Sequence, residues 1–322
     1  MRYYIFLLVF VLFSCATKPQ PEKTNQTNSV SYKVSEENVI KTLSYLASDE
    51  LEGRDSGSEG IEKAAVYLEN LLKENGVKPY FKTYRDTLSN FDKPAFNIVG
   101  YIEGTDKKLK NEFVIIGAHY DHIGMLQNGV NGDVIVNGAN DNATGTTAVT
   151  EIAKYFAKFK NNKRSVLFVF FSAEEKGLLG SKHLAAKLKE QKMDLYFMFN
   201  FEMIGVPMKD KGMDFYLTGF GKSNMATTMN EYAGEKLVGY LPIETKYMLF
   251  RASDNYPFFT EFNVPAQTVS TFDFENFEFY HQPDDEFELM DTKHMTNVIS
   301  KTIPVLEKMI NAPKKEIKLN EK

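Results

Sequence analysis

Six short apolar runs, which alternate with amphipathic segments, constrain the fold of this 322-residue chain more than any other feature. The runs are rich in β-branched and aromatic residues, and most are apolar at consecutive positions, as buried parallel strands are. We expect strands at residues 96–102, 112–118, 165–172, 195–204, 214–218 and 266–271. We expect helices at residues 60–73, 146–159, 178–189, 223–235, 256–262 and 292–309. The alternation predicts a single α/β domain, with a mostly parallel mixed sheet and helices on both faces.

Polar residues of the types that bind metals stand where apolar runs end. In a parallel sheet the carboxyl ends of the strands meet at one edge, where ligands gather. Each residue alone has an ordinary explanation, because a Glu-Glu pair is usually a solvated turn and a lone His is usually structural. Their joint placement is what indicates a site. The residues are His119 and Asp121 in GAHYDHIG, Asp141 in GANDNATG, Glu174 and Glu175 in FFSAEEKGLLGS, Glu202 in NFEMIG, and His281 in FYHQPDD.

Two histidines and three carboxylates suit zinc, which accepts imidazole nitrogen and carboxylate oxygen. Five ligands can hold two ions if one carboxylate bridges them. One glutamate of the 174–175 pair is then left beside a ligand, where it can serve as the general base of a hydrolase.

Seven motifs in this order resemble those of the secreted two-zinc aminopeptidases, a family that includes glutamate carboxypeptidase II, the transferrin receptor ectodomain and the glutaminyl cyclases. The resemblance runs from about residue 36 to residue 310. It implies a zinc-exopeptidase (phosphorylase/hydrolase-like) fold and hydrolysis of the N-terminal residue of peptides that have a free N terminus. The motifs are SDELEGRDSGSEG, GAHYDH, GANDNATG, FSAEEKGLLGS, NFEMIG, RASDNYPFF and FYHQPDD.

The resemblance also implies a role for each ligand. His119 and Glu202 would hold one zinc, and Glu175 and His281 the other, with Asp141 bridging the two ions. Family members usually have Asp in the place of Glu202, and the longer side chain changes the geometry or the affinity of that site. We nevertheless expect Glu202 to bind metal.

Three catalytic roles follow from the same resemblance. Glu174 would be the general base for a metal-bridging water, and Asp121 would accept a hydrogen bond from the second nitrogen of His119. Tyr280 matches a position where some members use a phenol to stabilise the tetrahedral intermediate, although a packed aromatic is the alternative. The peptide bond after Asp141 is expected to be cis. The remaining histidines are not expected to be ligands: His122, His183 and His294.

Three other functions occur in the same family. A glutaminyl cyclase with one zinc usually has Trp around its substrate pocket, and this chain contains no Trp. A binding protein that has lost its ligands is disfavoured because every ligand position is filled. Carboxypeptidase members are larger, and the 91–118 interval leaves no room for their inserted domain. The pocket walls are expected from the 208–213 and 246–251 loops.

Residues 1–15 have the pattern of an export signal. Arg2 precedes an apolar stretch that is too short to span a bilayer comfortably. The letters LFSC resemble a bacterial lipobox, in which cleavage before Cys15 leaves that residue lipidated. Cys15 is the only cysteine, so no intramolecular disulfide can form. We expect a lipoprotein of the cell envelope, periplasmic or on the outer surface, and the alternative is an ordinary secretory signal.

The remaining segments follow from composition. Residues 16–33 are rich in Pro, Asn and Thr and predict a flexible tether. The zinc peptidase domain is expected at 34–311, followed by a solvated polar tail at 312–322. A net charge of −5 provides no general attraction to nucleic acid, so membrane contact is expected only through the lipid anchor.

Overall fold

The computed structural model describes Met1 and residues 33–321. The expected export signal apart from Met1, its Cys15, and residues 16–32 of the expected tether lie outside the described residues. Among the residues described, no helix is long and apolar enough to cross a membrane.

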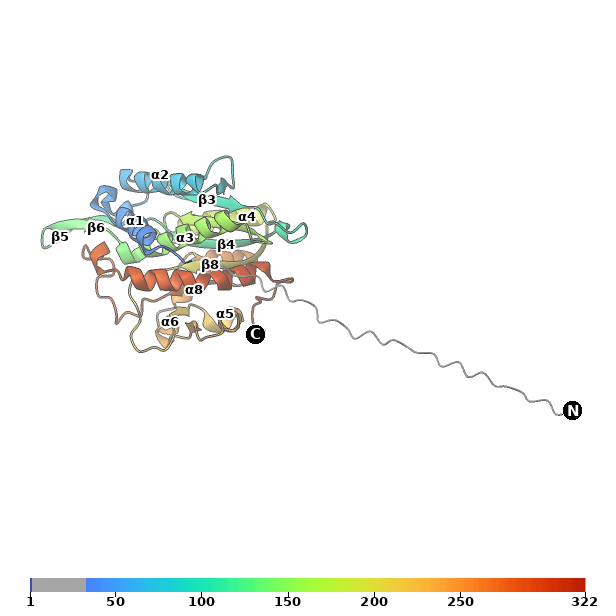
Figure 1. The fold of residues 1–322 in the computed structure, drawn as a ribbon. Helices are drawn as coiled ribbons and strands as arrows, with labels where there is room; N and C mark the ends of the chain where they lie inside the picture. The colour runs from blue at the N-terminus through green and yellow to red at the C-terminus, as the bar shows by residue number, and fades with distance from the viewer. Residues whose placement is uncertain (2–32, 322) are drawn as a thin grey trace. The chain divides into compact units, whose positions relative to one another are not determined.

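A nine-stranded mixed sheet forms the centre of the domain (Figure 1), with the spatial order β1-β3-β7-β4-β8-β11-β9-β10 and β2 paired with β3. Strands β7, β4, β8 and β11 run parallel, whereas β3 is antiparallel to β7 and β9 to β11. All six expected strands are present, with small differences at their ends. The strands are β1 (Lys78–Pro79), β2 (Arg85–Thr87), β3 (Phe96–Ile102), β4 (Glu112–His119), β7 (Ser165–Phe171), β8 (Asp194–Phe201), β9 (Phe215–Leu217), β10 (Val238–Gly239) and β11 (Ala266–Ser270).

The six expected helices are also confirmed, and the structure adds α1 and the short α6. Serine caps begin two of the helices, because Ser35 and Ser58 accept hydrogen bonds from free main-chain N–H groups in the first turns of α1 and α2. The helices are α1 (Glu36–Leu46), α2 (Glu59–Glu74), α3 (Thr144–Phe159), α4 (Leu179–Glu190), α5 (Met225–Ala233), α6 (Pro242–Lys246), α7 (Asn255–Phe262) and α8 (Thr292–Asn311). Single turns lie at η1 (Asp49–Arg54), η2 (Leu109–Asn111), η3 (Ala139–Ala143), η4 (Phe220–Lys222), η5 (Leu249–Arg251) and η6 (Phe287–Leu289).

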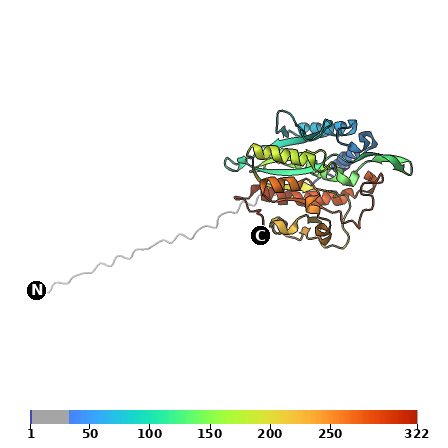
Figure 2. The ribbon, with the colours of Figure 1, turned by 180° about the vertical axis from the view of Figure 1, so that it is seen from behind.

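Helices cover both faces of the sheet, as expected. Successive residues of β7 point to opposite faces. Phe168 meets Phe156 of α3 on one face, which is the near face in Figure 1, where α8 also lies. Val169 packs with Leu184 of α4 and Phe258 of α7 on the other face, which is turned forward in Figure 2. Both faces of the parallel strands are therefore buried, which explains their continuous apolar sequences.

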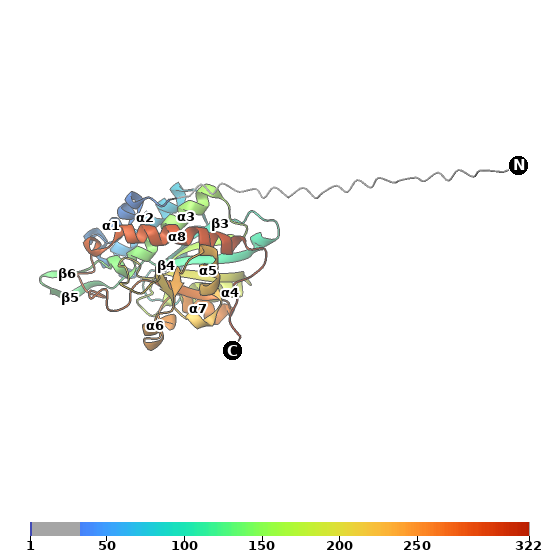
Figure 3. The ribbon, with the colours of Figure 1, turned by 60° about the horizontal axis from the view of Figure 1, so that its bottom comes forward.

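A two-stranded hairpin, β5 (Gly124–Val130) and β6 (Asp133–Val136), projects from one end of the domain (Figures 1 and 3). No strand was expected here, because Gly, Gln and Asn interrupt the apolar residues of β5, β6 has only four residues, and most positions are exposed. The turn has a recognisable signal, however. Asn131 and Gly132 have φ values of 53° and 91°, as the two central residues of a type I′ turn require.

The C-terminal segment corrects the sequence analysis. Residues 312–321 were expected to form a solvated tail, but Ile317 is only 2% exposed. The N–H groups of Glu316 and Ile317 donate to the Tyr196 hydroxyl at 2.7 and 2.9 Å, and Leu319 forms a bridge with Ser223. Side chains add to this attachment, because Asn224 hydrogen-bonds to the main chain of Glu316 and Lys318, so the segment is bound to the domain surface.

Arg54, at the end of η1, ties together segments that are far apart in the sequence. Its side chain is 1% exposed and donates to the main-chain oxygens of Tyr120 (2.9 Å), Asn137 (2.6 Å), Gly138 (2.9 Å) and Leu46. These carbonyls belong to α1 and to the two loops that flank the β5–β6 hairpin. A guanidinium group can serve all of them because it carries five donors in one plane.

We predict that Arg54→Met lowers the free energy of unfolding by at least about 3 kcal/mol. The substitution leaves several buried carbonyls without donors, and each such group costs about 1–3 kcal/mol. Urea unfolding followed by circular dichroism measures the effect. Arg251→Met is the matched control, because Arg251 is exposed and its loss should change stability by less than about 0.5 kcal/mol. Equal stability of the two variants would contradict this role of Arg54.

Candidate metal centre

The five expected ligands come together at the carboxyl ends of the parallel strands. His119 ends β4, and Glu175 and Glu202 follow β7 and β8. Asp141 lies in the π-helical turn η3, and His281 lies in the loop after β11. The donor atoms form groups that could hold metal ions. The five residues are His119, Asp141, Glu175, Glu202 and His281.

The first group, here called the His119 cluster, consists of His119, Asp141 and Glu202. Nε2 of His119 lies 3.2 Å from Asp141 Oδ1 and 3.2 Å from Glu202 Oε1. The second oxygen of Glu202 accepts a hydrogen bond of 2.8 Å from the Ser253 hydroxyl. The longer glutamate side chain thus reaches the cluster and is held there by Ser253.

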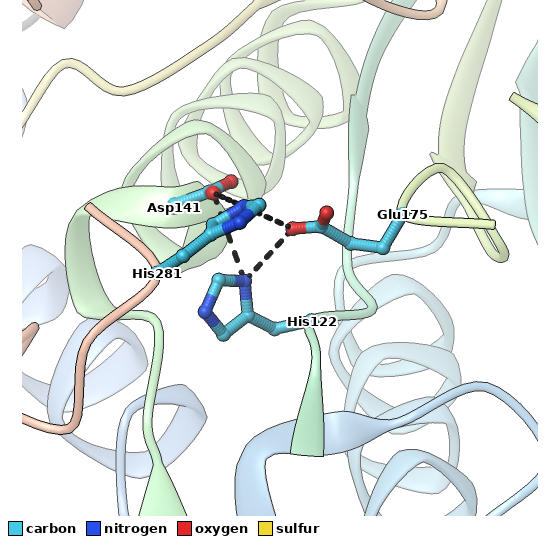
Figure 4. Close-up of side chains that lie close together, drawn as sticks. All are labelled: His122, Asp141, Glu175 and His281. Atoms are coloured by element: carbon cyan, nitrogen blue, oxygen red, sulfur yellow. Dashed lines mark hydrogen bonds and ion pairs between the residues drawn. The ribbon is translucent and has the colours of Figure 1, made fainter. Parts of the chain in front are cut away.

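The second group, here called the His281 cluster, consists of His122, Asp141, Glu175 and His281 (Figure 4). Nε2 of His281 lies 3.1 Å from Asp141 Oδ2 and 3.3 Å from Glu175 Oε1. Nδ1 of His122 lies 3.0 Å from the same Glu175 oxygen. From the sequence, His122 was not expected to be a ligand. Nothing in the residues around it indicates that its ring points toward Glu175 and Asp141.

Asp141 belongs to both clusters and presents a different oxygen to each. Its main chain is fixed by Asp285, whose carboxylate accepts from the N–H groups of Asn140 (2.7 Å) and Asp141 (3.1 Å). The peptide bond between Asp141 and Asn142 is cis, which confirms the expectation from the family resemblance. Asp285 was not singled out from the sequence, although it lies in the same motif as His281.

The Asp121 carboxylate lies beside His119 but makes its hydrogen bonds elsewhere. Its Oδ1 is 3.7 Å from His119 Nδ1, and that nitrogen is 3.1 Å from the main-chain oxygen of Asp121 instead. The carboxylate accepts from the N–H groups of Glu174 (3.2 Å) and Glu175 (3.4 Å) and from the Ser56 hydroxyl (3.2 Å). Asp121 therefore orients His119 through its main chain and fixes the Glu174–Glu175 turn through its side chain.

Glu174 lies next to the His119 cluster, and one of its oxygens groups with donor atoms of His119 and Glu175. Burial raises the pKa of Glu174 well above its usual range, and this effect exceeds the opposing one of His119. The neighbouring carboxylates of Asp254, Glu202 and Glu175 raise the pKa further. A carboxyl group whose pKa is raised in this way holds a proton more readily than an exposed one, as a group that takes up and releases a proton must.

A cavity of about 110 Å³ opens onto these side chains. Tyr280 lines it, 43% exposed, with its ring stacked on His281 at 3.9 Å between ring centroids. Leu249 contributes from the expected 246–251 loop, whereas the wall has no residue of the 208–213 loop. The other apolar lining residues are Met203, Tyr216, Ala252, Phe272 and Phe274.

The electrostatics of both clusters favour a bound cation. Burial lowers the pKa of His281, but the carboxylates of Asp141 and Glu175 outweigh it and raise the pKa to about 10. The pKa of His119 is likewise raised well above its usual range, against burial, by Glu202 and Glu174. A divalent cation held by the same nitrogen and oxygen atoms would supply the positive charge that these carboxylates favour. The nitrogen and carboxylate donors suit zinc.

The fold and the motifs agree with known proteins. The model for peptidase family M28 matches residues 97–305, and the chain belongs to this family. It is similar to aminopeptidase YwaD of Bacillus subtilis strain 168, with 30% identity over 201 residues that cover 60% of this chain and 40% of the relative. The chain thus spans less than half the length of this relative. The family expected from the sequence motifs is confirmed.

Two solved structures share the fold. The LapA aminopeptidase of Legionella pneumophila has a TM-score of 0.66 and 22% identity, with 87% of this chain and 73% of that chain covered. The glutaminyl cyclase of Porphyromonas gingivalis has a TM-score of 0.67 and 16% identity, with 86% of this chain and 100% of that chain covered. The expected α/β exopeptidase fold is therefore confirmed.

We predict that Glu202→Ala lowers the metal content of the purified protein by one ion per chain. The substitution removes one of the three donors of the His119 cluster and leaves the His281 cluster complete. Elemental analysis after dialysis against a weak chelator measures the change. Glu261→Ala, at an exposed position of α7, is the matched control and should keep the wild-type content. Wild-type metal content in Glu202→Ala would show that Glu202 does not bind metal.

Proposed function

We propose that this protein is a zinc-dependent aminopeptidase, which hydrolyses the peptide bond after the N-terminal residue and uses two zinc ions. The observation that carries the proposal is the position of Asp141, whose two oxygens lie 3.2 Å from His119 and 3.1 Å from His281. A carboxylate shared in this way is what a two-metal site needs as a bridge. His119 and Glu202 would complete one site, and Glu175 and His281 the other.

The charge of the cavity favours substrates with a free N terminus. Four carboxylates line it, Asp141, Glu174, Glu175 and Glu202, and its lining includes no Lys or Arg. Two bound zinc ions would largely offset these four negative charges, so the lack of a cationic side chain is the feature that discriminates. The C-terminal carboxylate of a peptide needs such a partner, whereas an α-amino group does not. This difference favours an aminopeptidase over a carboxypeptidase of the same family.

Glu174 carries the proton in the proposed reaction. Zinc ions bound at the two clusters would supply Lewis-acid polarisation of the scissile carbonyl and activation of water at neutral pH. Glu174 accepts a proton from the attacking water and later delivers it to the nitrogen of the leaving peptide. Asp121 keeps Glu174 in place by accepting its main-chain N–H at 3.2 Å. The Tyr280 hydroxyl would donate to the oxygen of the tetrahedral intermediate.

The rest of the cavity would receive the side chain of the N-terminal residue. Its walls away from the metal clusters are apolar, apart from the hydroxyl groups of Thr218, Ser253, Thr268 and Ser270. No charged side chain lines this part, so a charged N-terminal residue would lose hydration without gaining a partner. We therefore expect a preference for uncharged, mainly apolar N-terminal residues.

A glutaminyl cyclase is the second candidate, because one such enzyme shares the fold. The two reactions give different products from the same peptide, and this difference tests the proposal. A peptide with N-terminal Gln yields free glutamine by hydrolysis, but a cyclised N terminus of unchanged chain length by cyclase action. Release of free amino acids from unblocked peptides, and none from their N-acetylated copies, supports the aminopeptidase. Cyclisation without release would overturn it.

We predict that Glu174→Gln lowers kcat by at least about a hundredfold, within the range that general acid–base catalysis contributes. The amide keeps the size of the side chain but cannot accept the proton. KM and the zinc content should stay near the wild-type values, because the proposed ligands remain. Steady-state hydrolysis of amino-acid anilides and elemental analysis measure these quantities, with Glu261→Gln as the control. Turnover above about a tenth of wild type would rule out the role, and loss of zinc would show that Glu174 is a ligand.

We also propose that the protein is exported and anchored to the cell envelope through a lipid on Cys15. The support is the sequence pattern alone: a short apolar leader that ends at the only cysteine. We predict that Cys15→Ser releases the protein from the membrane fraction and leaves the kinetics of the enzyme unchanged. Membrane fractionation and mass spectrometry of the mature N terminus test this. A wild-type protein that is soluble and processed at another residue would contradict the proposal.

A further inference from the structure

His122 is placed in the His281 cluster by contacts that leave its ring little freedom. The residue is 0% exposed, and its main-chain N–H donates to the Arg54 oxygen at 3.2 Å. The ring packs against Gly138, where a Cβ atom would lie 2.5 Å from two ring carbons. Gly138 also has a φ of 56°, which favours glycine. The fold thus reserves space for this imidazole beside Asp141 and Glu175.

The four nitrogen–oxygen distances within the cluster are close to those of a tetrahedral metal site. Nδ1 of His122 lies 3.0 Å from Glu175 Oε1 and 3.7 Å from Asp141 Oδ2. Nε2 of His281 lies 3.3 and 3.1 Å from the same two oxygens. Ligand atoms about 2.0–2.2 Å from a tetrahedral zinc ion are about 3.4 Å apart. All four distances lie close to that value.

Hydrogen bonding alone does not account for this arrangement. Nε2 of His281 is buried and makes no hydrogen bond with the described residues, in spite of its short distances to two carboxylates. The two imidazole rings meet edge to face, with centroids 5.4 Å apart, and both direct a nitrogen at the same pair of oxygens (Figure 4). Lone pairs that converge on one point are what a shared cation requires.

We propose that His122 is a fourth protein ligand, bound through Nδ1, of the metal ion in the His281 cluster. This inference rests on the two-metal centre of the proposed function. It adds that the two metal sites differ in their number of protein ligands. The His281 cluster then has four protein donors, the number found in closed structural zinc sites. The His119 cluster has three, the number found in catalytic sites that keep an open position.

The cavity supports this division of roles. Its lining includes all three residues of the His119 cluster but neither His122 nor His281. The His119 cluster thus presents all of its donor residues to the substrate cavity, whereas the His281 cluster presents two of its four, Asp141 and Glu175. We expect the ion of the His281 cluster to bind first and to be retained more strongly, because it has one more protein donor.

NMR of protein labelled with ¹⁵N at histidine, followed during zinc titration of the metal-free full chain, tests the proposal. The chain has five histidines, which His→Asn variants assign one at a time. The first equivalent of zinc should shift Nδ1 of His122 and Nε2 of His281 to values typical of metal-bound imidazole, and the second should shift Nε2 of His119. An Nδ1 of His122 that keeps its free-imidazole shift at saturation would overturn the proposal.

A competition titration with a chelator adds a second measurement. His122→Asn should weaken binding of the tighter zinc ion by more than about a hundredfold, beyond the 10–100-fold that loss of a residue hydrogen-bonded to a ligand typically costs. His183→Asn, distant from both clusters, is the matched control. A loss within 100-fold would assign His122 to hydrogen bonding with Glu175 instead. If the wild-type chain binds two zinc ions and His122 is a ligand of neither, only this inference fails. If the wild-type chain binds no zinc, the proposed function fails as well.

Discussion

The centre depends on one carboxylate that serves two groups of ligands. Asp141 directs one oxygen to His119 and the other to His281, so the position of this side chain sets the spacing of both clusters. Two distant residues fix the turn that carries it. The Asp285 carboxylate accepts hydrogen bonds from two main-chain N–H groups of the turn. The Arg54 side chain donates to the main-chain oxygens of Asn137 and Gly138, just before the turn. The parallel strands supply the other ligands, because their carboxyl ends meet at the same edge of the sheet.

The second constraint is the accumulation of like charge. Five carboxylates lie within or next to the two clusters, and burial of unpaired charge is costly. The three histidines of the two clusters, His119, His122 and His281, reduce this cost only in part, since the carboxylates still raise the pKa of His281 to about 10. Bound cations would offset the remaining repulsion. The charge pattern and the donor geometry are therefore consistent with the same conclusion. The five carboxylates are Asp121, Asp141, Glu174, Glu175 and Glu202.

The elements that could be predicted from sequence are those with a strong local signal. The runs at β3, β4 and β7 are continuously apolar because both faces are buried, and their positions follow directly from that pattern. The residues of the two clusters could be singled out because most of them stand at the ends of such runs, within motifs of a known family. The β5–β6 hairpin is mostly exposed and its apolar residues are interrupted by Gly, Gln and Asn, and the segment around Ile317 is mostly polar, so local pattern did not distinguish either from a loop.

The supporting residues of the site required three-dimensional information. Ser253 reaches Glu202, and Asp285 reaches Asp141, across long separations in the chain. His122 illustrates the same point, because only the fold brings its Nδ1 to the oxygens shared with His281.

The most direct test of the two-metal centre is anomalous diffraction at the zinc absorption edge from crystals of the zinc-loaded protein. The account predicts two peaks on either side of the Asp141 carboxylate, one in contact with His119 and Glu202 and the other with Glu175 and His281. A single peak, or two peaks of which neither contacts Asp141, would contradict it.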